Sequence, residues 1–386
     1  MKRLFIIFGI WILAAGVIFI GLKVAAQDMG TRLREKAAKA QAGVRSWAVQ
    51  GRDPSAILAV MQQVKPALDA GDSKKAEALL DRAMKMLAED TKAAEPGDLS
   101  LLPVSTASEK ESDLYVRPEP IVISGYDGSA MEPFISPDGH TLFFNNENDP
   151  TVNTNLHFAE RTGKLAFRYL GELPGVNSEV LDAAASLDRS GHFYFTTLRD
   201  YDRTMNSLYT GEFDGKRVVN LRPVAGDISP KTPGAINMDV SISPDGQTLY
   251  ISRALIFPGA PPKKSELMVA KLKDGVFGID PDSAQIMKNL NTGALQYAPS
   301  ISADGRELYF TRASQLKAGL KAPVVLLRIL VATRISENEP FGEPFALTAL
   351  TGFVEAPTVP LDGKEMFFHK KIGKRFVIYR AERNER

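Results

Sequence analysis

One short phrase occurs five times after residue 130 of this chain, and it limits the fold more than any other feature. The copies are EPFISPDGHTLFF (Glu132–Phe144), DAAASLDRSGHFYF (Asp182–Phe195), DVSISPDGQTLYI (Asp239–Ile251), APSISADGRELYF (Ala298–Phe310) and EAPTVPLDGKEMFF (Glu355–Phe368). Their aromatic anchors, Phe143, Tyr194, Tyr250, Tyr309 and Phe367, are 51 to 59 residues apart. A repeat of this length is typical of an array or a propeller.

Each copy reads as a β-hairpin followed by two further strands. An Asp-Gly turn separates two alternating runs, because glycine accepts the positive φ of a tight turn; the second copy has Asp-Arg-Ser-Gly instead. Third strands are predicted at Leu156–Arg161, Leu208–Phe213, Leu267–Leu272, Ile329–Arg334 and Ile378–Arg383. Fourth strands are predicted at Phe167–Ser178, Val218–Val224, Gln285–Gly293 and Pro344–Gly352. Four strands per repeat predict an all-β, five-bladed β-propeller.

The fifth repeat lacks a fourth strand, because the chain stops at Arg386 directly after the third. Upstream, Glu119–Pro133 has the same Glu-Pro to Pro spacing as Glu343–Pro357, which holds the fourth strand of repeat four. We therefore predict that Ile121–Ser124 completes the last blade from the N-terminal side. Such a closure removes an exposed strand edge.

The Ser-Pro-Asp-Gly turn, the Leu-Tyr-Phe strand and the Leu-Tyr-x-Ala-x-Arg strand resemble the WD-like propeller repeats of the TolB type. The resemblance covers about Glu119–Arg386. It implies a propeller of a kind that serves as an interaction platform, as a gate on peptidases or as a polysaccharide-active enzyme. The chain departs from TolB itself, which has six blades and an α/β domain before them.

Three segments precede the propeller, which is assigned to residues 119–386. Residues 1–26 contain a long uncharged run after Lys2 and Arg3, and are predicted to be a transmembrane anchor or a cleaved signal peptide. Either reading places the rest of the chain outside the cytoplasm, in a bacterial cell envelope. Residues 27–94 show helical periodicity, with a hairpin around Gly71 that resembles half of a tetratricopeptide (TPR) repeat. Residues 95–118 are predicted to be a linker.

Composition and motifs exclude several classes of function. The net charge of +1 gives no reason to expect nucleic acid, and the absence of cysteine excludes disulfides and thiol catalysis. The sequence has no nucleophile elbow, zinc helix or phosphate loop. The four histidines lack ligand spacing, so we expect no metal and no cofactor.

The candidate site follows from position along the repeats. Acidic residues stand just before the inner strand in four copies, and basic residues follow the second strand. The ligand-binding candidates at the channel mouth are Glu132, Asp182, Asp239, Glu355, Arg253 and Arg312. One reading is that such acids and bases pair between neighbouring blades and hold the ring together. The other reading is a polar mouth that recognises a ligand.

Three functions stay open at this point. The favoured one is a non-enzymatic envelope scaffold that binds a protein or peptide through the channel face. The second is a glycoside hydrolase, since five-bladed propellers include furanosidase-type enzymes that use channel carboxylates. The third is a carbohydrate-binding module. Similar acids in similar places argue against catalysis, because an acid and a base need different environments.

Overall fold

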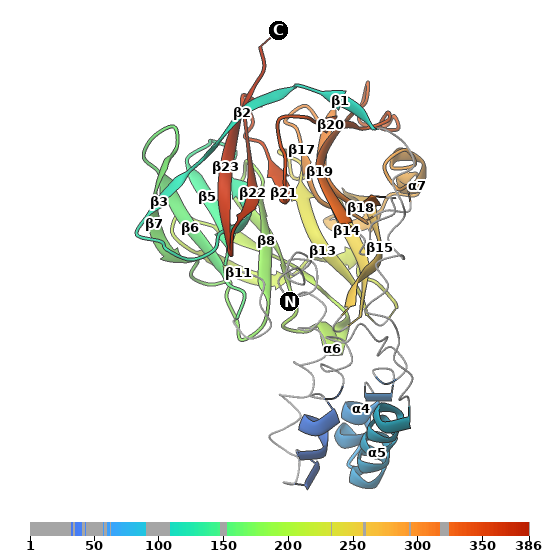
Figure 1. The fold of residues 1–386 in the computed structure, drawn as a ribbon. Helices are drawn as coiled ribbons and strands as arrows, with labels where there is room; N and C mark the ends of the chain where they lie inside the picture. Colours follow the sequence, from blue (N-terminus) through green and yellow to red (C-terminus); the bar gives the residue numbers. More distant parts are fainter. Residues whose placement is uncertain are drawn as a thin grey trace.

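A computed structural model describes residues 63–89, 109–146 and 153–385, with short gaps at 233, 258–259, 293–294 and 317–323, and scattered residues between 32 and 61. Between residues 109 and 385 it shows five β-sheets whose inner strands contact one another in a closed ring, as predicted (Figure 1). The predicted helix at residues 1–26 lies outside the described residues.

Each blade has four antiparallel strands, ordered from the channel outward. Blade 1 comprises β4 (Met131–Ile135), β5 (Thr141–Asn145), β6 (Leu156–Arg161) and β7 (Ala166–Glu172). Blade 2 comprises β8 (Asp182–Leu187), β9 (His192–Thr197), β10 (Leu208–Phe213) and β11 (Val218–Pro223). Blade 3 comprises β13 (Ala235–Ile242), β14 (Thr248–Phe257), β15 (Ala260–Lys273) and β16 (Val276–Ile279). Blade 4 comprises β17 (Leu295–Ile301), β18 (Glu307–Leu316), β19 (Val324–Thr333) and β20 (Phe345–Leu347). Blade 5 comprises β21 (Val354–Thr358), β22 (Glu365–Ile372), β23 (Arg375–Arg383) and, from upstream, β2 (Tyr115–Pro120).

The repeated phrase forms the hairpin between the first two strands of each blade. In blade 3, the Ser243 hydroxyl donates to Asp245 Oδ1 at 2.6 Å and accepts from the Thr248 N–H at 2.9 Å. Gly246 follows with φ +74°, a conformation that suits glycine. The same bonds recur at Ser302 and Asp304 in blade 4. The Ser-x-Asp-Gly motif is therefore explained by the turn alone.

The arginine of the third-strand motif holds neighbouring blades together. Arg161 of blade 1 lies 5.7 Å from the ring centre of Phe367 in blade 5, and Arg334 of blade 4 lies 5.8 Å from that of Tyr250 in blade 3. Arg383 of blade 5 donates to the Tyr309 hydroxyl in blade 4 at 3.3 Å. Each partner is the aromatic anchor of the preceding repeat. The most regular part of the sequence thus specifies the packing between blades.

The prediction that a strand from the N-terminal side completes the last blade is confirmed, but this strand lies upstream of the predicted one. β2 pairs antiparallel with β23, so Tyr115–Pro120 is the fourth strand of blade 5. The predicted strand, Ile121–Ser124, instead contains β3 (Val122–Ser124), which pairs in parallel with β7 of blade 1. Its first residue still reaches blade 5, where the Ile121 N–H donates to the Ile378 carbonyl. Bonding to β23 ends at Ile121, and from Val122 the chain pairs with β7, so it crosses from blade 5 to blade 1 at this point.

The N-terminal side of the propeller contributes more than one strand. β1 (Lys110–Ser112) pairs in parallel with β20 of blade 4, before β2 and β3 join blades 5 and 1. Residues 110–118 are therefore strand and turn, and the predicted linker 95–118 is too long at this end. We call residues 109–124 the closing strap, since they join three consecutive blades across the chain ends.

One predicted fourth strand is wrong. Residues 285–293 contain the end of a single-turn helix, α7 (Ser283–Ile286), and the fourth strand of blade 3 is β16 instead. The Asp274-Gly275 turn, with Gly275 at φ +80°, forms the hairpin into β16. Gly226 begins β12 (Gly226–Asp227), which lies so close to β16 that a Cβ there would meet the Phe277 carbonyl oxygen at 1.8 Å.

The helical region includes α4 (Val64–Asp69) and α5 (Ser73–Glu89), joined at Gly71 as predicted. Asp72 accepts from the Lys75 N–H at 2.9 Å and so caps α5. The apolar faces of α4 and α5 pack on Ala37, Ala40, Ile57 and Met61. Figure 1 shows α4 and α5 beyond α6 (Tyr201–Thr204), which follows β9. Among the described residues, no helix is both long and apolar enough to cross a membrane.

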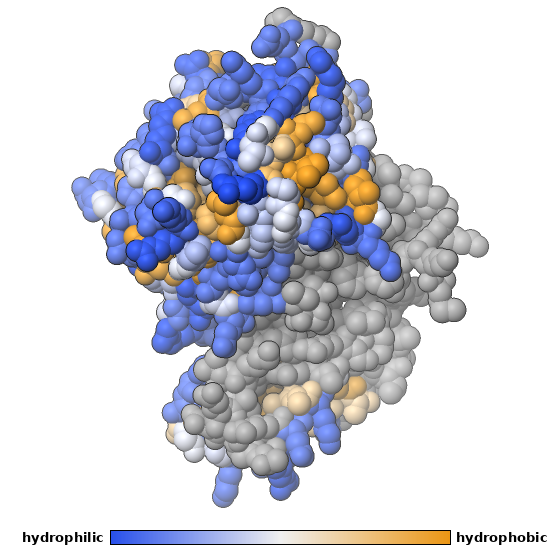
Figure 2. Space-filling view, turned by 90° about the vertical axis from the view of Figure 1, so that its left-hand side faces the viewer, coloured by the Kyte–Doolittle hydropathy of each residue, from blue (hydrophilic) through white to orange (hydrophobic). Residues whose placement is uncertain are grey.

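Figure 2 looks onto the side of the propeller that carries β3 and β7, and shows a mostly hydrophilic surface with hydrophobic residues gathered toward its middle. Two exposed large hydrophobic residues, Val122 and Leu170, belong to these strands. Individually exposed apolar residues such as these two are normal on protein surfaces. We therefore assign no site to this side.

Candidate functional site

The predicted acids lie inside the inner strands and not before them. Glu132 is in β4, Asp182 begins β8, Asp239 is in β13 and Glu355 is in β21. The inner strand of every blade contains a register shift, and Glu132 has φ +48°. A bulge adds an unpaired residue and turns side chains away from the regular alternation. Reasoning from a period of two misses this shift and therefore places the start of each strand after its acid.

Asp182 belongs to a contact within its own blade. Its carboxylate accepts from Arg199 at 2.7 Å and from the Ser178 hydroxyl at 2.7 Å, and it is fully buried. Burial raises the pKa of Asp182, whereas the Arg199 charge opposes that rise. The structure thus gives Asp182 a structural role and separates it from the other three acids.

The two predicted arginines are also bound by neighbouring groups. Arg253 donates to Asn237 Oδ1 at 2.9 Å and to the Ile228 carbonyl at 2.5 Å. Arg312 donates to Glu109 at 2.8 Å and to the Leu290 carbonyl at 2.9 Å. These bonds direct both guanidinium groups to acceptors other than the predicted acids. The expected acid–base mouth is therefore not formed by the six predicted residues together.

Three of the predicted acids do come together, around a tyrosine and a histidine. The Tyr297 hydroxyl donates to Glu355 Oε1, and His369 Nε2 lies 3.1 Å from Glu355 Oε2. The Glu132 N–H donates to His369 Nδ1 at 3.0 Å, which assigns the ring proton to Nε2. Inner strands of blades 1, 4 and 5 and the second strand of blade 5 thus meet at one network.

Asp239 joins the same network from blade 3. Its Oδ2 accepts from the Ala298 N–H at 3.0 Å, next to Tyr297 in β17. Burial raises the pKa of Asp239 to about 7, and the charge of Glu355 adds to the rise while Ala298 and Ser252 oppose it. Burial also raises the pKa of Tyr297 well above its usual range, with contributions from Glu355, Asp239 and Glu132. All three acids therefore act on one hydroxyl group.

We name Glu132, Asp239, Tyr297, Glu355 and His369 the channel cluster. Asp239 is 5% exposed, Glu355 3% and His369 1%, whereas Glu132 is only half-buried. Within the described part of the chain, no lysine or arginine forms an ion pair with Asp239 or Glu355. The cluster is thus acidic and enclosed, and Glu132 is its most exposed residue although its Oε2 is buried.

Sequence reasoning missed Tyr297 and His369. Tyr297 directly precedes the fourth copy of the phrase, in the repeat that has Gln296 before its inner strand where the other four repeats have an acid. His369 directly follows the aromatic pair Phe367-Phe368 and reads, from the sequence alone, as a strand histidine without a ligand role. A signal existed for both, since each lies close to a predicted position or to a copy of the phrase. The described residues contain no group of three or more side chains placed to hold a metal ion.

Comparisons with known proteins find only distant structural similarities. No protein-family model and no curated protein sequence matches the chain. Among solved structures, a putative TolB from Agrobacterium tumefaciens shares 14% identity over 66% of this chain and 74% of that one, with a TM-score of 0.36. Zg3597, a family 117 glycoside hydrolase from Zobellia galactanivorans, shares 10% over 70% and 91%, with a TM-score of 0.45. A mannose phosphorylase from Leishmania mexicana shares 10% over 69% and 89%, with a TM-score of 0.41. Similarity at this level supports no conclusion about this chain.

Proposed function

We propose that this protein is a non-enzymatic cell-envelope scaffold whose channel binds a positively charged side chain of a protein or peptide. The observation that carries the proposal is the convergence of Glu132, Asp239 and Glu355, while no described lysine or arginine pairs with Asp239 or Glu355. A buried carboxylate is costly unless a cation compensates it. A lysine or arginine from a partner would supply that compensation.

The enclosure of the channel cluster favours one slender group over a large ligand. Tyr297 and Ala298 also belong to an apolar layer that includes Met238 and Ala356. An extended lysine side chain has an apolar stem that suits such a layer and a charged head that suits the acids. Glu132, the half-buried member, would meet the ligand first.

The localisation is part of the same proposal. Residues 1–26 would hold the protein in the envelope membrane or export it, and the helical region would link that segment to the propeller. The run of uncharged residues after Lys2 and Arg3 supports membrane anchoring or export, because it has the length of a membrane-spanning helix. Fusing residues 1–27 to a periplasmic reporter tests export directly.

Equilibrium binding of a short oligolysine peptide to the full chain tests the function. We expect measurable binding that is lost in Asp239→Asn and weakened in Glu132→Gln. The matched control is Asp245→Asn, which makes the same charge change in the same blade but in the turn bonded to Ser243. Equal binding by wild type and all three variants would overturn the proposal.

A second function, glycoside hydrolysis, is favoured by one specific observation. Burial raises the pKa of Asp239 to about 7, while the neighbouring Glu355 is held by two hydrogen-bond donors. Glycosidases need two carboxyl groups whose environments keep one protonated and the other ionised. Release of nitrophenol from aryl furanosides by wild type, and its loss in Asp239→Asn, would favour this function over the scaffold.

A further inference from the structure

Blade 4 contains a pair of arginines that face each other directly. Arg312 in β18 and Arg328 in β19 are cross-strand partners in the antiparallel register. Like charges in such positions repel each other, and nothing in the repeat requires them. An anion between them would remove the conflict.

That anion is Glu109, from the closing strap. Its Oε1 accepts from Arg312 at 2.8 Å and its Oε2 accepts from Arg328 at 2.9 Å, so one carboxylate bridges both guanidinium groups. Arg312 is 8% exposed, Glu109 13% and Arg328 34%. Charge-assisted bonds of this kind are the strong ones, and here they are shielded from water on one side.

The arginine pair retains unused capacity. Arg312 Nε is buried and has no hydrogen-bond partner among the described residues, while the two terminal nitrogens bind Glu109 and the Leu290 carbonyl. A guanidinium group binds carboxylate best through two parallel N–H donors. Glu109 therefore does not use the full geometry that Arg312 offers.

The segment that carries Glu109 is held by weak contacts. β1, which follows directly, pairs with β20 over Lys110–Ser112, and its burial pattern is exposed, exposed, half-buried. The Lys110–Glu343 ion pair beside it is solvent-exposed and contributes little. Short edge strands of this kind open locally at low free-energy cost.

We propose that Arg312 and Arg328 form a carboxylate-binding site, which Glu109 fills as a built-in ligand and which an acidic segment of a partner protein can take over. Displacement would release β1 from blade 4. The strap that completes the propeller would thereby also sense an acidic partner. This site is separate from the channel cluster and takes the opposite charge.

Chemical rescue of Glu109→Ala in the full chain tests the site. The variant leaves two unbridged arginines, so its melting temperature should fall by about 4 °C or more. Acetate should restore the melting temperature with saturable concentration dependence. It should restore it more than chloride does at the same ionic strength. Glu343→Ala, which removes the acid that pairs with Lys110 of β1, should show neither the loss nor the rescue. Rescue by acetate absent in Glu109→Ala would overturn the site.

Hydrogen exchange in the wild type tests displacement. Pentaglutamate should accelerate exchange at Lys110–Ser112 several-fold, whereas pentalysine should not. In Arg328→Ala the acceleration should disappear, which separates the site from a general salt effect. Acetate could rescue Glu109→Ala while pentaglutamate leaves the hydrogen-exchange protection of β1 unchanged. In that case Glu109 stays bound to the two arginines, and the proposal that a partner displaces it is wrong.

Discussion

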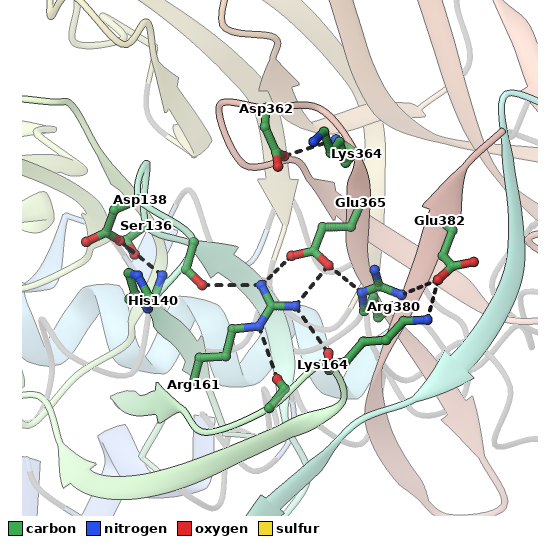
Figure 3. Close-up of polar contacts among 12 residues, drawn as sticks. Ser136, Asp138, His140, Arg161, Lys164, Asp362, Lys364, Glu365, Arg380 and Glu382 are labelled. Carbon is green, nitrogen blue, oxygen red and sulfur yellow. Dashed lines mark hydrogen bonds and ion pairs between the residues drawn. The ribbon is translucent and has the colours of Figure 1, made fainter. Parts of the chain in front are cut away.

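The propeller contains two sets of carboxylates that differ in charge compensation. One set pairs with arginines, and the other does not. At the junction of blades 5 and 1, Glu365 accepts from Arg161 at 2.9 Å and also from Arg380, which bonds Glu382 in turn (Figure 3). Burial alone would raise the pKa of Glu365, but the bonds and charges of the two arginines outweigh it and lower the pKa. In the channel, Asp239 has no such cation among the described residues, and its pKa rises to about 7.

The difference separates acids that hold the fold from acids that are available to a ligand. A carboxylate between two arginines has its negative charge compensated within the chain. The channel cluster keeps its acids near one another and near Tyr297, an arrangement that costs stability. Functional sites commonly carry such a cost.

The largest expected effect comes from removing the part of the closing strap that pairs with blades 5 and 1. Deletion of Tyr115–Ser124 removes β2 and β3 and leaves the edge of β23 unpaired. We expect loss of a soluble propeller, because an exposed strand edge promotes aggregation. Size-exclusion chromatography checks this. A monomeric, cooperatively unfolding deletion variant would show that the junction is stable without its strap.

The second effect tests the paired acid. Glu365→Ala should lower the free energy of unfolding by about 3–5 kcal/mol, because it leaves the buried Arg380 and the half-buried Arg161 without their shared carboxylate. Glu160→Ala is the control: it breaks an exposed ion pair with Arg168 and should change stability by about 0.5 kcal/mol at most. Denaturant unfolding measures both, and equal small losses would contradict the assigned role.

The third effect has the opposite sign. The pKa of Asp239 is raised in the folded state from 3.8 to about 7, so the folded protein binds more protons and loses stability as pH rises through that interval. Asp239→Asn should therefore gain about 2–4 kcal/mol at pH 8 and nothing at pH 4. Unfolding of both proteins at the two pH values checks this. A loss of stability at pH 8 would mean that Asp239 has a cationic partner.

The smallest effect concerns the hydroxyl at the centre of the cluster. Tyr297→Phe removes the donor to Glu355 Oε1 and leaves the bond between Glu355 Oε2 and His369 in place. We expect a loss of about 1–2 kcal/mol, because one hydrogen bond to a buried carboxyl group disappears. Thermal unfolding measures the loss. Tyr379→Phe is the control, because Tyr379 lies in β23 and outside the channel cluster.

The fold was largely predictable because the sequence features that determine each blade occur five times. Turn chemistry and aromatic anchors recur in each blade, so an irregular copy such as Asp182–Phe195 could still be placed by its neighbours. The closing strand was misplaced by a few residues, because Glu119–Pro133 contains only the end of β2 but all of β3, and the repeat pattern does not show where the chain crosses.

The site was only partly predictable for a related reason. Bulges and positive φ angles bring Glu132, Asp239 and Glu355 together, and these depend on contacts between blades that the sequence pattern does not show. Arg312 looked available because its partner, Glu109, lies 203 residues away. Long-range pairing decides which charged residues are compensated and which are not.

The pH dependence of oligolysine binding tests the central claim most directly. If the channel cluster binds a cation through Asp239, affinity should rise as pH increases from 6 to 8, because the carboxyl group loses its proton over that range. Asp239→Asn should show no measurable binding at any pH in this range, and Asp245→Asn should follow the wild type. Affinity that is unchanged or falls across this range in the wild type would contradict the account.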